Sequence, residues 1–258
     1  MEQQFHQITI EFLKAYKLQF NLYLTKKMQK ILLITPTYNE SENIQKFIDS
    51  TLIFEDLSLL VVDDNSPDGT ASIVDRNMQN NSSLNMIKRS GKLGYGSAII
   101  EGYKWGMKND YDYFIQMDTD FSHRFEDLEE LIKQRRDYDL IIGSRYVLGG
   151  ATKGWTKRRQ YLSKYANKLC GLILKSKVKD QTSGFRLLNK KIITEILDFS
   201  PKVNGYAFLV EITNLIEKSN YKIKEVPITF HDRSYGTSKM SFKIILEAIL
   251  FLIKKIFV

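Results

Sequence analysis

The sequence predicts an α/β fold in which a mainly parallel β-sheet carries helices on both faces. Short apolar runs alternate along the chain with longer amphipathic stretches, and this alternation is typical of βαβ units. Strands in such sheets are buried on both sides, which fits runs that are mostly apolar. Hydrophobic residues make up 43% of the 258 residues, which is enough for a sizeable core.

Five apolar runs are predicted to form the strands: 31–35, 57–63, 85–88, 113–118 and 139–144. Helices are predicted between and after them, near 41–52, 69–79, 95–108 and 124–136. Ligands of such sheets bind at the carboxyl ends of the strands. The unusual polar residues stand where the runs stop: PTYNE after the first, DDNSPDG after the second, DTD after the fourth and SRY after the fifth. We therefore expect the functional site at this edge.

The second half of the chain is less regular. A basic loop, GGATKGWTKRR, precedes a predicted helix over 160–175, and DQTSGFR separates it from a helix around 208–219. A strand-like segment over 223–230 and a loop over 231–239 follow. No internal repeat, low-complexity tract or proline-rich linker divides residues 29–241, so one continuous domain is the simplest interpretation.

The two ends of the chain are interpreted separately. Residues 1–28 lack the compact apolar core of a secretory signal, and we expect a loosely attached N-terminal extension. Residues 242–258 are rich in Ile, Leu and Phe but are interrupted by Glu247, Lys254 and Lys255. They fall short of the ~20 apolar residues that span a bilayer, which predicts an amphipathic helix on a membrane surface or packed on the protein.

The charge balance favours anionic partners. Lysine and arginine outnumber aspartate and glutamate by 38 to 30, which gives +8 and suits phosphates, nucleic acid or an acidic membrane. The single cysteine, Cys170, excludes an internal disulfide and fits a reducing compartment, where we expect it to be an inert packing residue.

Asp118 and Asp120, separated only by Thr119, are the candidate metal ligands. Glu40, Asp63 and Asp64 are predicted at the same edge, where their negative charges would repel one another. A divalent cation would relieve that repulsion, and oxygen-only ligands favour Mg²⁺ or Mn²⁺ over zinc. The alternative is a solvated turn that binds no ion.

Basic residues beside loops are the candidate phosphate ligands: Lys92, Arg145, Lys157, Arg158, Arg159, Arg233 and Lys239. Guanidinium groups grip phosphate oxygens in a bidentate way, although each residue could equally belong to a solvated basic face. The glycine loop GKLGYG is not a Walker loop, since its lysine precedes the glycines. No G-x-G-x-x-G follows the first strand either, which weakens kinase-type and dinucleotide interpretations.

Taken in order, PTYNE, VVDDNSPDGT, KLGYGSA, MDTDFSH, GSRY, DQTSGFR and HDRSYGTSKMS resemble the motif series of family 2 glycosyltransferases. The series is most similar to that of the dolichol- or polyprenol-phosphate mannosyltransferases and covers roughly residues 30–242. The resemblance implies a GT-A fold, which is Rossmann-like, with a nucleotide-sugar at the sheet edge. It also implies inverting transfer of mannose from GDP-mannose to a polyprenyl (dolichyl-type) phosphate.

The resemblance also implies residue roles. Nucleotide-sugar contacts fall on Pro36, Tyr38, Glu40, Val62, Asp64, Lys92, Asp118, Thr119, Asp120, Arg145, Arg159, Arg233 and Lys239. The catalytic residues among them are Asp118, Asp120, Arg145 and Arg233. The metal ligands are Asp118 and Asp120, with Ser122 a weaker third because its hydroxyl is neutral. The acceptor side falls on Asp180, Gly184, Arg186 and Glu211. Gly184 could instead serve a turn, and Glu211 could be an ordinary helix residue.

A phosphate acceptor simplifies the expected chemistry. With a second pKa of about 6, a phosphomonoester is already largely a dianion at neutral pH and needs no general base. The enzyme must then position two anions and stabilise the departing diphosphate. His123 and His231 adjoin two motifs, and we interpret both as loop hydrogen-bonding residues rather than proton shuttles.

A polyprenyl tail requires that the site meets a membrane. We expect the C-terminal helix, with Lys243, Lys254 and Lys255, to dock on the cytoplasmic face, although core packing or a dimer contact is the alternative. A peripheral enzyme of this kind leaves room for a separate membrane-anchoring partner and does not require nucleic acid. Two other functions stay open: transfer of a hexose from a UDP-sugar, and a non-catalytic nucleotide- or nucleic-acid-binding module.

Overall fold

The computed structural model describes residues 29–201, 205–233 and 252. The predicted extension over 1–28, Lys239 and all but Leu252 of the predicted C-terminal helix over 242–258 lie outside the described residues. Among the described residues, no helix is long and apolar enough to cross a membrane.

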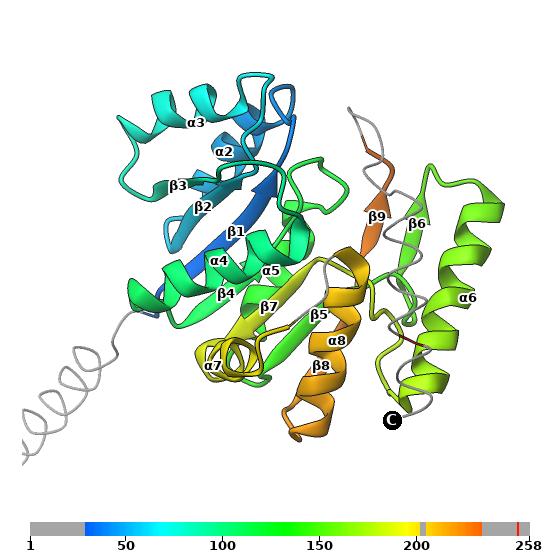
Figure 1. Ribbon diagram of the computed structural model, residues 1–258. Coiled ribbons are helices and arrows are strands. Elements are labelled where there is room, and N and C mark those ends of the chain that lie inside the picture. Colours follow the sequence, from blue (N-terminus) through cyan, green and yellow to red (C-terminus); the bar gives the residue numbers. More distant parts are fainter. Residues whose placement is uncertain (1–28, 202–204, 234–251, 253–258) are drawn as a thin grey trace, which may run out of the picture.

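The core of the fold is a mainly parallel, Rossmann-like sheet of seven strands (Figure 1). Its strands, in spatial order, are β3 (Leu84–Lys88), β2 (Leu57–Asp63), β1 (Ile31–Thr37), β4 (Tyr113–Gln116), β7 (Arg186–Asn189), β5 (Leu140–Ser144) and β8 (Ile223–Pro227). Only β7 runs antiparallel to its neighbours, β4 and β5. The predicted fold class is thus confirmed, and all five predicted strands are present.

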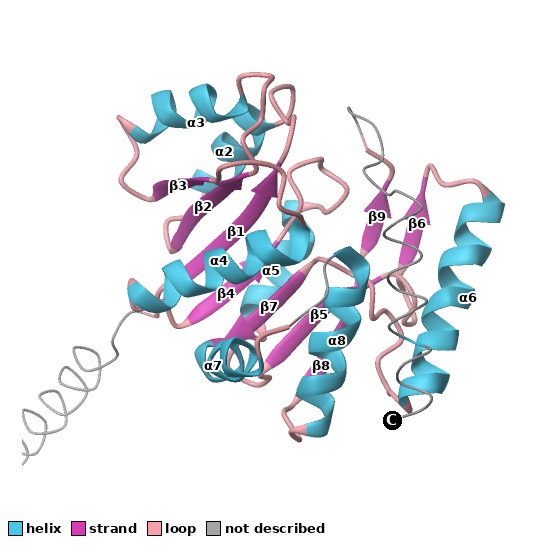
Figure 2. Cartoon of the chain, in the orientation of Figure 1, coloured by secondary structure: helices cyan, strands magenta, loops and turns pink. Residues whose placement is uncertain are grey.

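Helices cover both faces of this sheet (Figure 2). Their bounds are α2 (Ile44–Leu52), α3 (Thr70–Met78), α4 (Tyr95–Lys108), α5 (Phe125–Lys133), α6 (Lys157–Leu174), α7 (Lys190–Phe199) and α8 (Gly205–Lys218). Alternate side chains of β1 enter different cores: Ile31 and Leu33 pack with α2, α3 and α5, whereas Leu32 and Ile34 pack with α4, α7 and α8. This two-sided burial follows from the period of two in a strand.

A second, two-stranded parallel sheet joins β6 (Ala151–Lys153) to β9 (Thr229–His231) beside α6 (Figure 2). The strand predicted over 223–230 is therefore two strands. Between them, the Ile228 amide donates to Ser144 of β5, and the Ile228 carbonyl accepts from Ala151 of β6. The chain thus leaves one sheet for the other at Ile228, which periodicity along a single segment does not reveal.

Close packing of α4 on the sheet depends on Gly106. A Cβ atom there would lie 2.4 Å from Phe114 Cε1 and 2.7 Å from Leu32 Cδ2. We expect Gly106→Ala to lower the free energy of unfolding by about 1–3 kcal/mol, because overpacking outweighs the gain of ~1 kcal/mol in helix propensity. Chemical denaturation measures this change.

Gly171 in α6 provides the matched control for that prediction. A Cβ atom there would meet its nearest atoms, Gln181 Nε2 and the Ser176 carbonyl oxygen, at an ordinary 3.6 Å. Gly171→Ala should therefore raise stability by up to ~1 kcal/mol through helix propensity alone. A gain in stability for Gly106→Ala would contradict the packing argument.

Candidate active site

The predicted site residues gather at the carboxyl edge of the sheet, where β1, β2 and β4 end side by side. The Asp118–Thr119–Asp120 segment directly follows β4. Thr119 is buried, and its Oγ1 lies 2.8 Å from Thr35 Oγ1 of β1. The Thr119 hydroxyl is thus turned towards the sheet, and its side chain anchors the segment that carries the two carboxylates.

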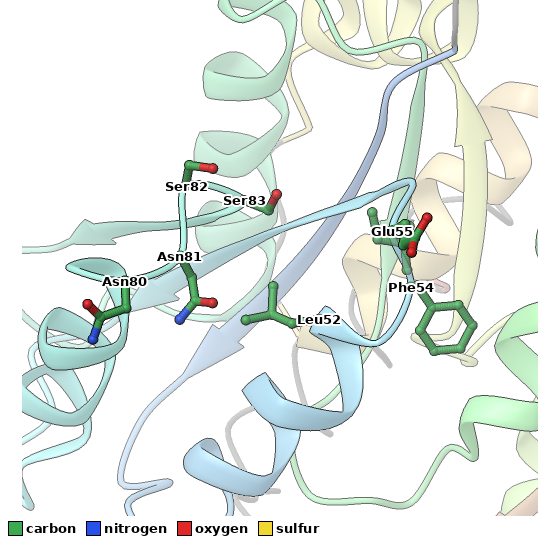
Figure 3. A pocket seen from close by; sticks show the side chains of 8 residues that line it. Leu52, Phe54, Glu55, Asn80, Asn81, Ser82 and Ser83 are labelled. Carbon is green, nitrogen blue, oxygen red and sulfur yellow. The ribbon is translucent and has the colours of Figure 1, made fainter.

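A separate hollow of about 220 Å³ lies at the opposite, amino-terminal edge of the sheet (Figure 3). Its lining comes from the segments that precede β2 and β3 and from the end of α2: Leu52, Phe54, Glu55, Leu57, Asn80, Asn81, Ser82 and Ser83. None of these is a predicted site residue, so this hollow is not part of the candidate active site.

Asp120 and Arg233 are 113 positions apart in the sequence and form an ion pair. Arg233 Nε lies 3.0 Å from Asp120 Oδ2, and the Asp120 side chain is nearly buried. The Ser122 amide donates to Asp120 Oδ1 at 3.1 Å, and the Ser122 carbonyl accepts from the His231 amide at 3.0 Å. The end of β9 thus holds the arginine against the aspartate, and the structure brings together two residues predicted to be catalytic.

Asp118 and Asp120 alone supply too few ligands for a complete divalent-ion site. Among the described residues, no group of three or more His, Cys, Asp or Glu side chains could hold a metal. Mg²⁺ commonly uses one or two carboxylates together with substrate phosphates, which matches Asp118 and Asp120. Ser122 Oγ is buried and has no hydrogen-bond partner in the described part of the chain, so an oxygen is available beside them. The residues therefore fit an ion that the donor's phosphates help to bind.

The backbone at Gly184 passes close to Tyr95 and Asp118. A Cβ atom at Gly184 would lie 2.9 Å from the Tyr95 hydroxyl and 3.9 Å from Asp118 Oδ1. The sequence assigned Gly184 to the acceptor side or to a turn. In the structure a larger residue here would push on Tyr95, at the start of α4, next to the Asp118 carboxylate.

The second acidic motif is held inside the protein. Asp63 accepts hydrogen bonds from Thr37 and Ser66 and closes its own loop. Asp64 accepts from Arg89 Nη1 at 2.5 Å and from the Leu93 and Gly94 amides at 3.1 Å each. Asp64 therefore fixes the glycine loop at the site's edge, and its predicted contact with the nucleotide-sugar stays a prediction.

Arg89 is a buried cation at the edge of the candidate site that was not predicted from the sequence. It is buried, and besides Asp64 it contacts Glu101 at 3.1 Å and donates to Ser97 Oγ at 2.6 Å. Arg89 stands in the sequence between a predicted strand and the glycine loop GKLGYG. This position could have identified it, because a cation there can contact both elements. Lys92, the next basic residue along the chain, is the cation of this loop that was predicted to contact phosphate.

Lys92 and Tyr38 meet across the site, with Lys92 Nζ 4.1 Å from the centre of the Tyr38 ring. This cation–π contact joins the glycine loop to the loop after β1. Glu40, in the same loop, is buried and accepts from Asn43 at 2.9 Å. Pro36 pairs with Val62 in the register of β1 and β2, but the Val62 side chain is fully buried in the core. The nucleotide-sugar contact that the resemblance implies for Val62 would therefore fall on its backbone, and it stays a prediction.

Arg145 and Asp180 were predicted on different parts of the site, and the structure joins them. Asp180 accepts from the Arg145 amide at 2.9 Å, from Nε at 2.7 Å and from Nη2 at 2.6 Å. Arg145 also donates to Thr182 and lies over the rings of Trp155 and Phe230. Asp180 is completely buried, so in this structure it orients Arg145 and has no surface for the acceptor.

Arg186, which the resemblance places on the acceptor side, has a completely buried side chain. Its guanidinium donates to the carbonyls of Gln181, Ser183 and Leu209 and to Thr213 Oγ1, at 2.7–3.1 Å. Burial lowers the pKa of Arg186 to about 10. The side chain braces the 181–183 segment against α8 and cannot touch an acceptor directly. Glu211 is also buried, on α8.

Arg159 lies on the outer side of the site, at the start of α6. It pairs with Asp232 at 3.0 Å and lies 4.0 Å from the Trp155 ring centre. Arg145 is 5.6 Å from the same ring, so Trp155 contacts both cations. Among the predicted phosphate ligands, Arg145, Arg159 and Arg233 thus lie around β6 and β9, whereas Lys239 lies outside the described residues.

His123 is buried between two aromatic rings. Its ring stacks on Phe185 at 4.8 Å and meets Phe230 edge-on at 5.1 Å. Burial lowers the pKa of His123 to about 4, against the opposing effect of the Asp120 charge. A neutral imidazole does not suit a proton shuttle at neutral pH. Within the described residues the buried Nδ1 of His123 has no hydrogen-bond partner, so the ring is held by packing rather than by the loop hydrogen bond that the sequence predicted.

We expect the ring of His123 to stay neutral from pH 5.5 to 8. NMR titration of the protein in the presence of a chelator should show no midpoint for its Cε1 proton near 6.5, the ordinary value. Because the folded-state pKa is lowered, this group destabilises the fold progressively as the pH falls from about 6.5 towards 4. A midpoint above 6 would contradict the burial argument.

Known proteins resemble the chain over most of its length. The model of glycosyl transferase family 2 matches residues 32–197. Polyprenol monophosphomannose synthase of Mycolicibacterium smegmatis is 36% identical over 223 residues, which are 85% of this chain and 84% of that protein. Undecaprenyl-phosphate mannosyltransferase of Micrococcus luteus is 36% identical over 221 residues, which are 85% of this chain and 91% of that protein.

The fold also resembles that of a mannosyltransferase of Pyrobaculum calidifontis, PcManGT, solved with GDP-Man and Mn²⁺. The TM-score is 0.57 at 14% identity, over 87% of this chain and 64% of that one. This likeness supports the predicted GT-A fold. Because the family model matches more than half of the chain and two relatives align with 85% of it, the chain belongs to glycosyl transferase family 2 and is a glycosyltransferase.

Proposed function

We propose that the chain transfers mannose from GDP-mannose to a polyprenyl phosphate, with inversion at the anomeric carbon. The observation that carries this proposal is the 36% identity to two relatives whose names both join mannose to a polyprenyl phosphate. The neighbour solved with GDP-Man and Mn²⁺ supports the choice of donor at the level of the fold.

The chemistry follows from the charges at the sheet edge. A phosphate oxygen of the lipid attacks the anomeric carbon, the bond from that carbon to GDP breaks, and the electron pair leaves with the β-phosphate oxygen. The acceptor carries no proton that must be removed at neutral pH, which agrees with a buried, neutral His123. Arg233 and Arg145 would stabilise the anions that approach and depart.

Asp118 and Asp120 would hold Mg²⁺ or Mn²⁺. When bound, the ion supplies positive charge for the departing diphosphate. Asp120 would share its charge between the ion and Arg233, which lies 3.0 Å away. The Arg89–Asp64 pair and the Lys92–Tyr38 contact would keep the glycine loop in place beside the nucleotide.

The proposed acceptor also implies a subcellular location. A polyprenyl acceptor is confined to a bilayer, so we propose a peripheral enzyme on the cytoplasmic face of a membrane. A separate membrane-anchoring partner is compatible with this arrangement.

Product analysis tests the function. The purified chain is incubated with radiolabelled GDP-mannose, Mg²⁺ or Mn²⁺, and undecaprenyl phosphate in detergent. We expect an acid-labile mannolipid whose anomeric configuration is opposite to that of the donor. A parallel reaction with radiolabelled UDP-glucose should give no labelled lipid. If UDP-glucose gave labelled lipid and GDP-mannose did not, the sugar transferred would be a hexose other than mannose. Absence of any lipid product, together with salt-sensitive oligonucleotide binding, would favour a non-catalytic module.

A further inference from the structure

Trp155 lies against two of the arginines that are predicted to bind phosphate. The centre of its ring is 4.0 Å from the guanidinium carbon of Arg159 and 5.6 Å from that of Arg145. Both distances are within the ~6 Å at which an aromatic ring attracts a cation. The ring also meets Phe230 of β9 edge-on, with 5.3 Å between the two ring centres. One indole thus contacts two cations and an aromatic side chain of the small sheet.

The connection from β6 to α6 brings the indole to this place. Gly154 has a left-handed backbone with a φ of 82°, and a Cβ atom there would lie only 2.8 Å from Asp232 Cβ. Glycine therefore allows the chain to pass close to the end of β9 before Trp155. Thr156 then caps α6, because its side chain accepts from the Arg159 amide. The same short connection thus places both the indole and one of its two arginines.

The indole N–H does not explain the position of the ring. Trp155 Nε1 is buried and has no hydrogen-bond partner within the described part of the chain. Buried donors usually have a partner, so an indole without one is retained for another reason. The contacts that the ring does make, to Arg145, Arg159 and Phe230, depend on its aromatic surface. A phenyl ring could supply such a surface, whereas an aliphatic side chain could not.

Two guanidinium groups beside one indole repel each other, so each needs a neighbour that holds it in place. Asp180 holds Arg145 in a buried ion pair. Asp232 pairs with Arg159 in an exposed one. Each carboxylate also cancels a positive charge, whereas an aromatic ring attracts a cation without neutralising it. A guanidinium that stacks on a ring keeps its N–H donors in its own plane, where phosphate oxygens can accept from them.

We propose that Trp155 is a positioning residue whose indole holds Arg145 and Arg159 together, so that both can bind one phosphate group of a substrate. The phosphate comes either from the prenyl phosphate acceptor or from the GDP part of the donor. The inference deepens the proposed function and rests on it, because both sources are its substrates. Trp155 acts through the two arginines and takes no part in the bonds that form and break.

Transfer kinetics on the full chain test the proposal. Trp155→Leu keeps an apolar side chain but removes both cation–π contacts, and it should lower kcat/KM with a water-soluble, short-chain prenyl phosphate about ten-fold. The loss should appear as a higher KM for the substrate whose phosphate the arginines bind, with the other KM and kcat changed less than about two-fold. Trp155→Phe restores an aromatic ring and should return kcat/KM to within about three-fold of the unmodified chain.

Trp105, the other tryptophan of the chain, provides the matched control. It is half-buried like Trp155, and it also packs on an aromatic ring, that of Tyr111, with 5.9 Å between the ring centres. It lies in the last turn of α4, whose opposite end is the one at the candidate site. Trp105→Leu should therefore change neither KM by more than about two-fold.

Tryptophan fluorescence reports on the same place without turnover. In Trp105→Phe, Trp155 is the only tryptophan, and a phosphate bound by its arginines should change its emission saturably, because the electric field at the ring changes. The titrations use the short-chain prenyl phosphate, GDP and inorganic phosphate, each with Mg²⁺ in a phosphate-free buffer. We expect saturation at the lowest concentration with the substrate whose KM rises in Trp155→Leu. In Trp155→Phe, where only Trp105 remains, the emission should stay constant.

Each outcome decides the inference. Unchanged kinetics of Trp155→Leu would overturn it, and so would a loss in Trp155→Phe as large as that in Trp155→Leu. If Trp155→Leu did not fold, as judged by circular dichroism, the fluorescence of Trp105→Phe would decide, because that variant keeps the indole. A response to none of the three ligands, or to inorganic phosphate alone, would contradict the proposal.

The proposed function can fail separately. Absence of mannose transfer by the unmodified chain would reject that function but would leave the fluorescence titration intact. A saturable response of Trp155 to prenyl phosphate or to GDP would then still support its place beside a phosphate-binding pair of arginines.

Discussion

Asp120→Asn should lower kcat/KM for mannose transfer by about 10²–10³-fold while the protein stays folded. The substitution keeps the shape of the side chain but removes the charge that lies 3.0 Å from Arg233 Nε. It also removes one of the two carboxylates proposed to hold the divalent ion. Initial rates at varied donor and metal concentrations measure the effect, and a rise in the metal concentration for half-maximal rate would support the proposed contact with the ion.

Asp127→Asn provides the matched control for that substitution. Asp127 is also a nearly buried carboxylate paired with an arginine, Arg124, but it lies on α5 and outside the candidate site. We expect this variant to lose some stability and to keep its transfer rate. If Asp120→Asn retained more than about a tenth of the activity, the proposed role of Asp120 would be wrong.

Asp180→Ala should lower the free energy of unfolding by about 3–5 kcal/mol, because it leaves Arg145 buried without its counter-charge. Asp180 is completely buried and accepts three hydrogen bonds from Arg145. For a chain of this size the loss corresponds to a fall in Tm of about 6–20 °C. Thermal and denaturant unfolding, followed by circular dichroism, measure it.

Two further variants test whether the loss of stability comes from burial of the Arg145–Asp180 pair or would follow from breaking any ion pair. Asp232→Ala breaks the exposed pair with Arg159 and should cost less than about 1 kcal/mol. Arg145→Met/Asp180→Leu removes both buried charges and should recover much of the stability lost in Asp180→Ala. A double variant that is no more stable than Asp180→Ala would show that the loss does not come from the unpaired arginine.

The Arg145–Asp180 pair also explains a difference between the sequence interpretation and the structure. The two residues stand in separate motifs, GSRY and DQTSGFR, and each motif was assigned to a different ligand. In the structure the aspartate holds the arginine, and Arg186 holds the segment that carries Thr182. Contacts between residues 35 positions apart depend on how β5 and β7 pair, which a motif does not encode.

The strands and helices of the first half could be predicted because their signals are local. An apolar run bounded by polar loop residues identified β2 with the same ends, 57–63, and amphipathic spacing identified α4 at 95–108. The segment over 186–199 was not predicted, since β7 is only four residues long and takes its place by pairing antiparallel with β4 and β5. Its stability comes from partners that are distant in sequence.

By itself, the sequence determined the fold class and the family and predicted the edge of the sheet that carries the candidate site, because strand periodicity and the order of motifs are properties of the linear chain. Only the tertiary structure decided which charged groups meet: Asp120 with Arg233, Asp64 with Arg89, and Arg145 with Asp180. It also decided that Arg186 is buried and that α6 has an exposed apolar face. Burial and ion pairing depend on the distances that folding creates between residues far apart in the sequence, and these distances are absent from any single segment.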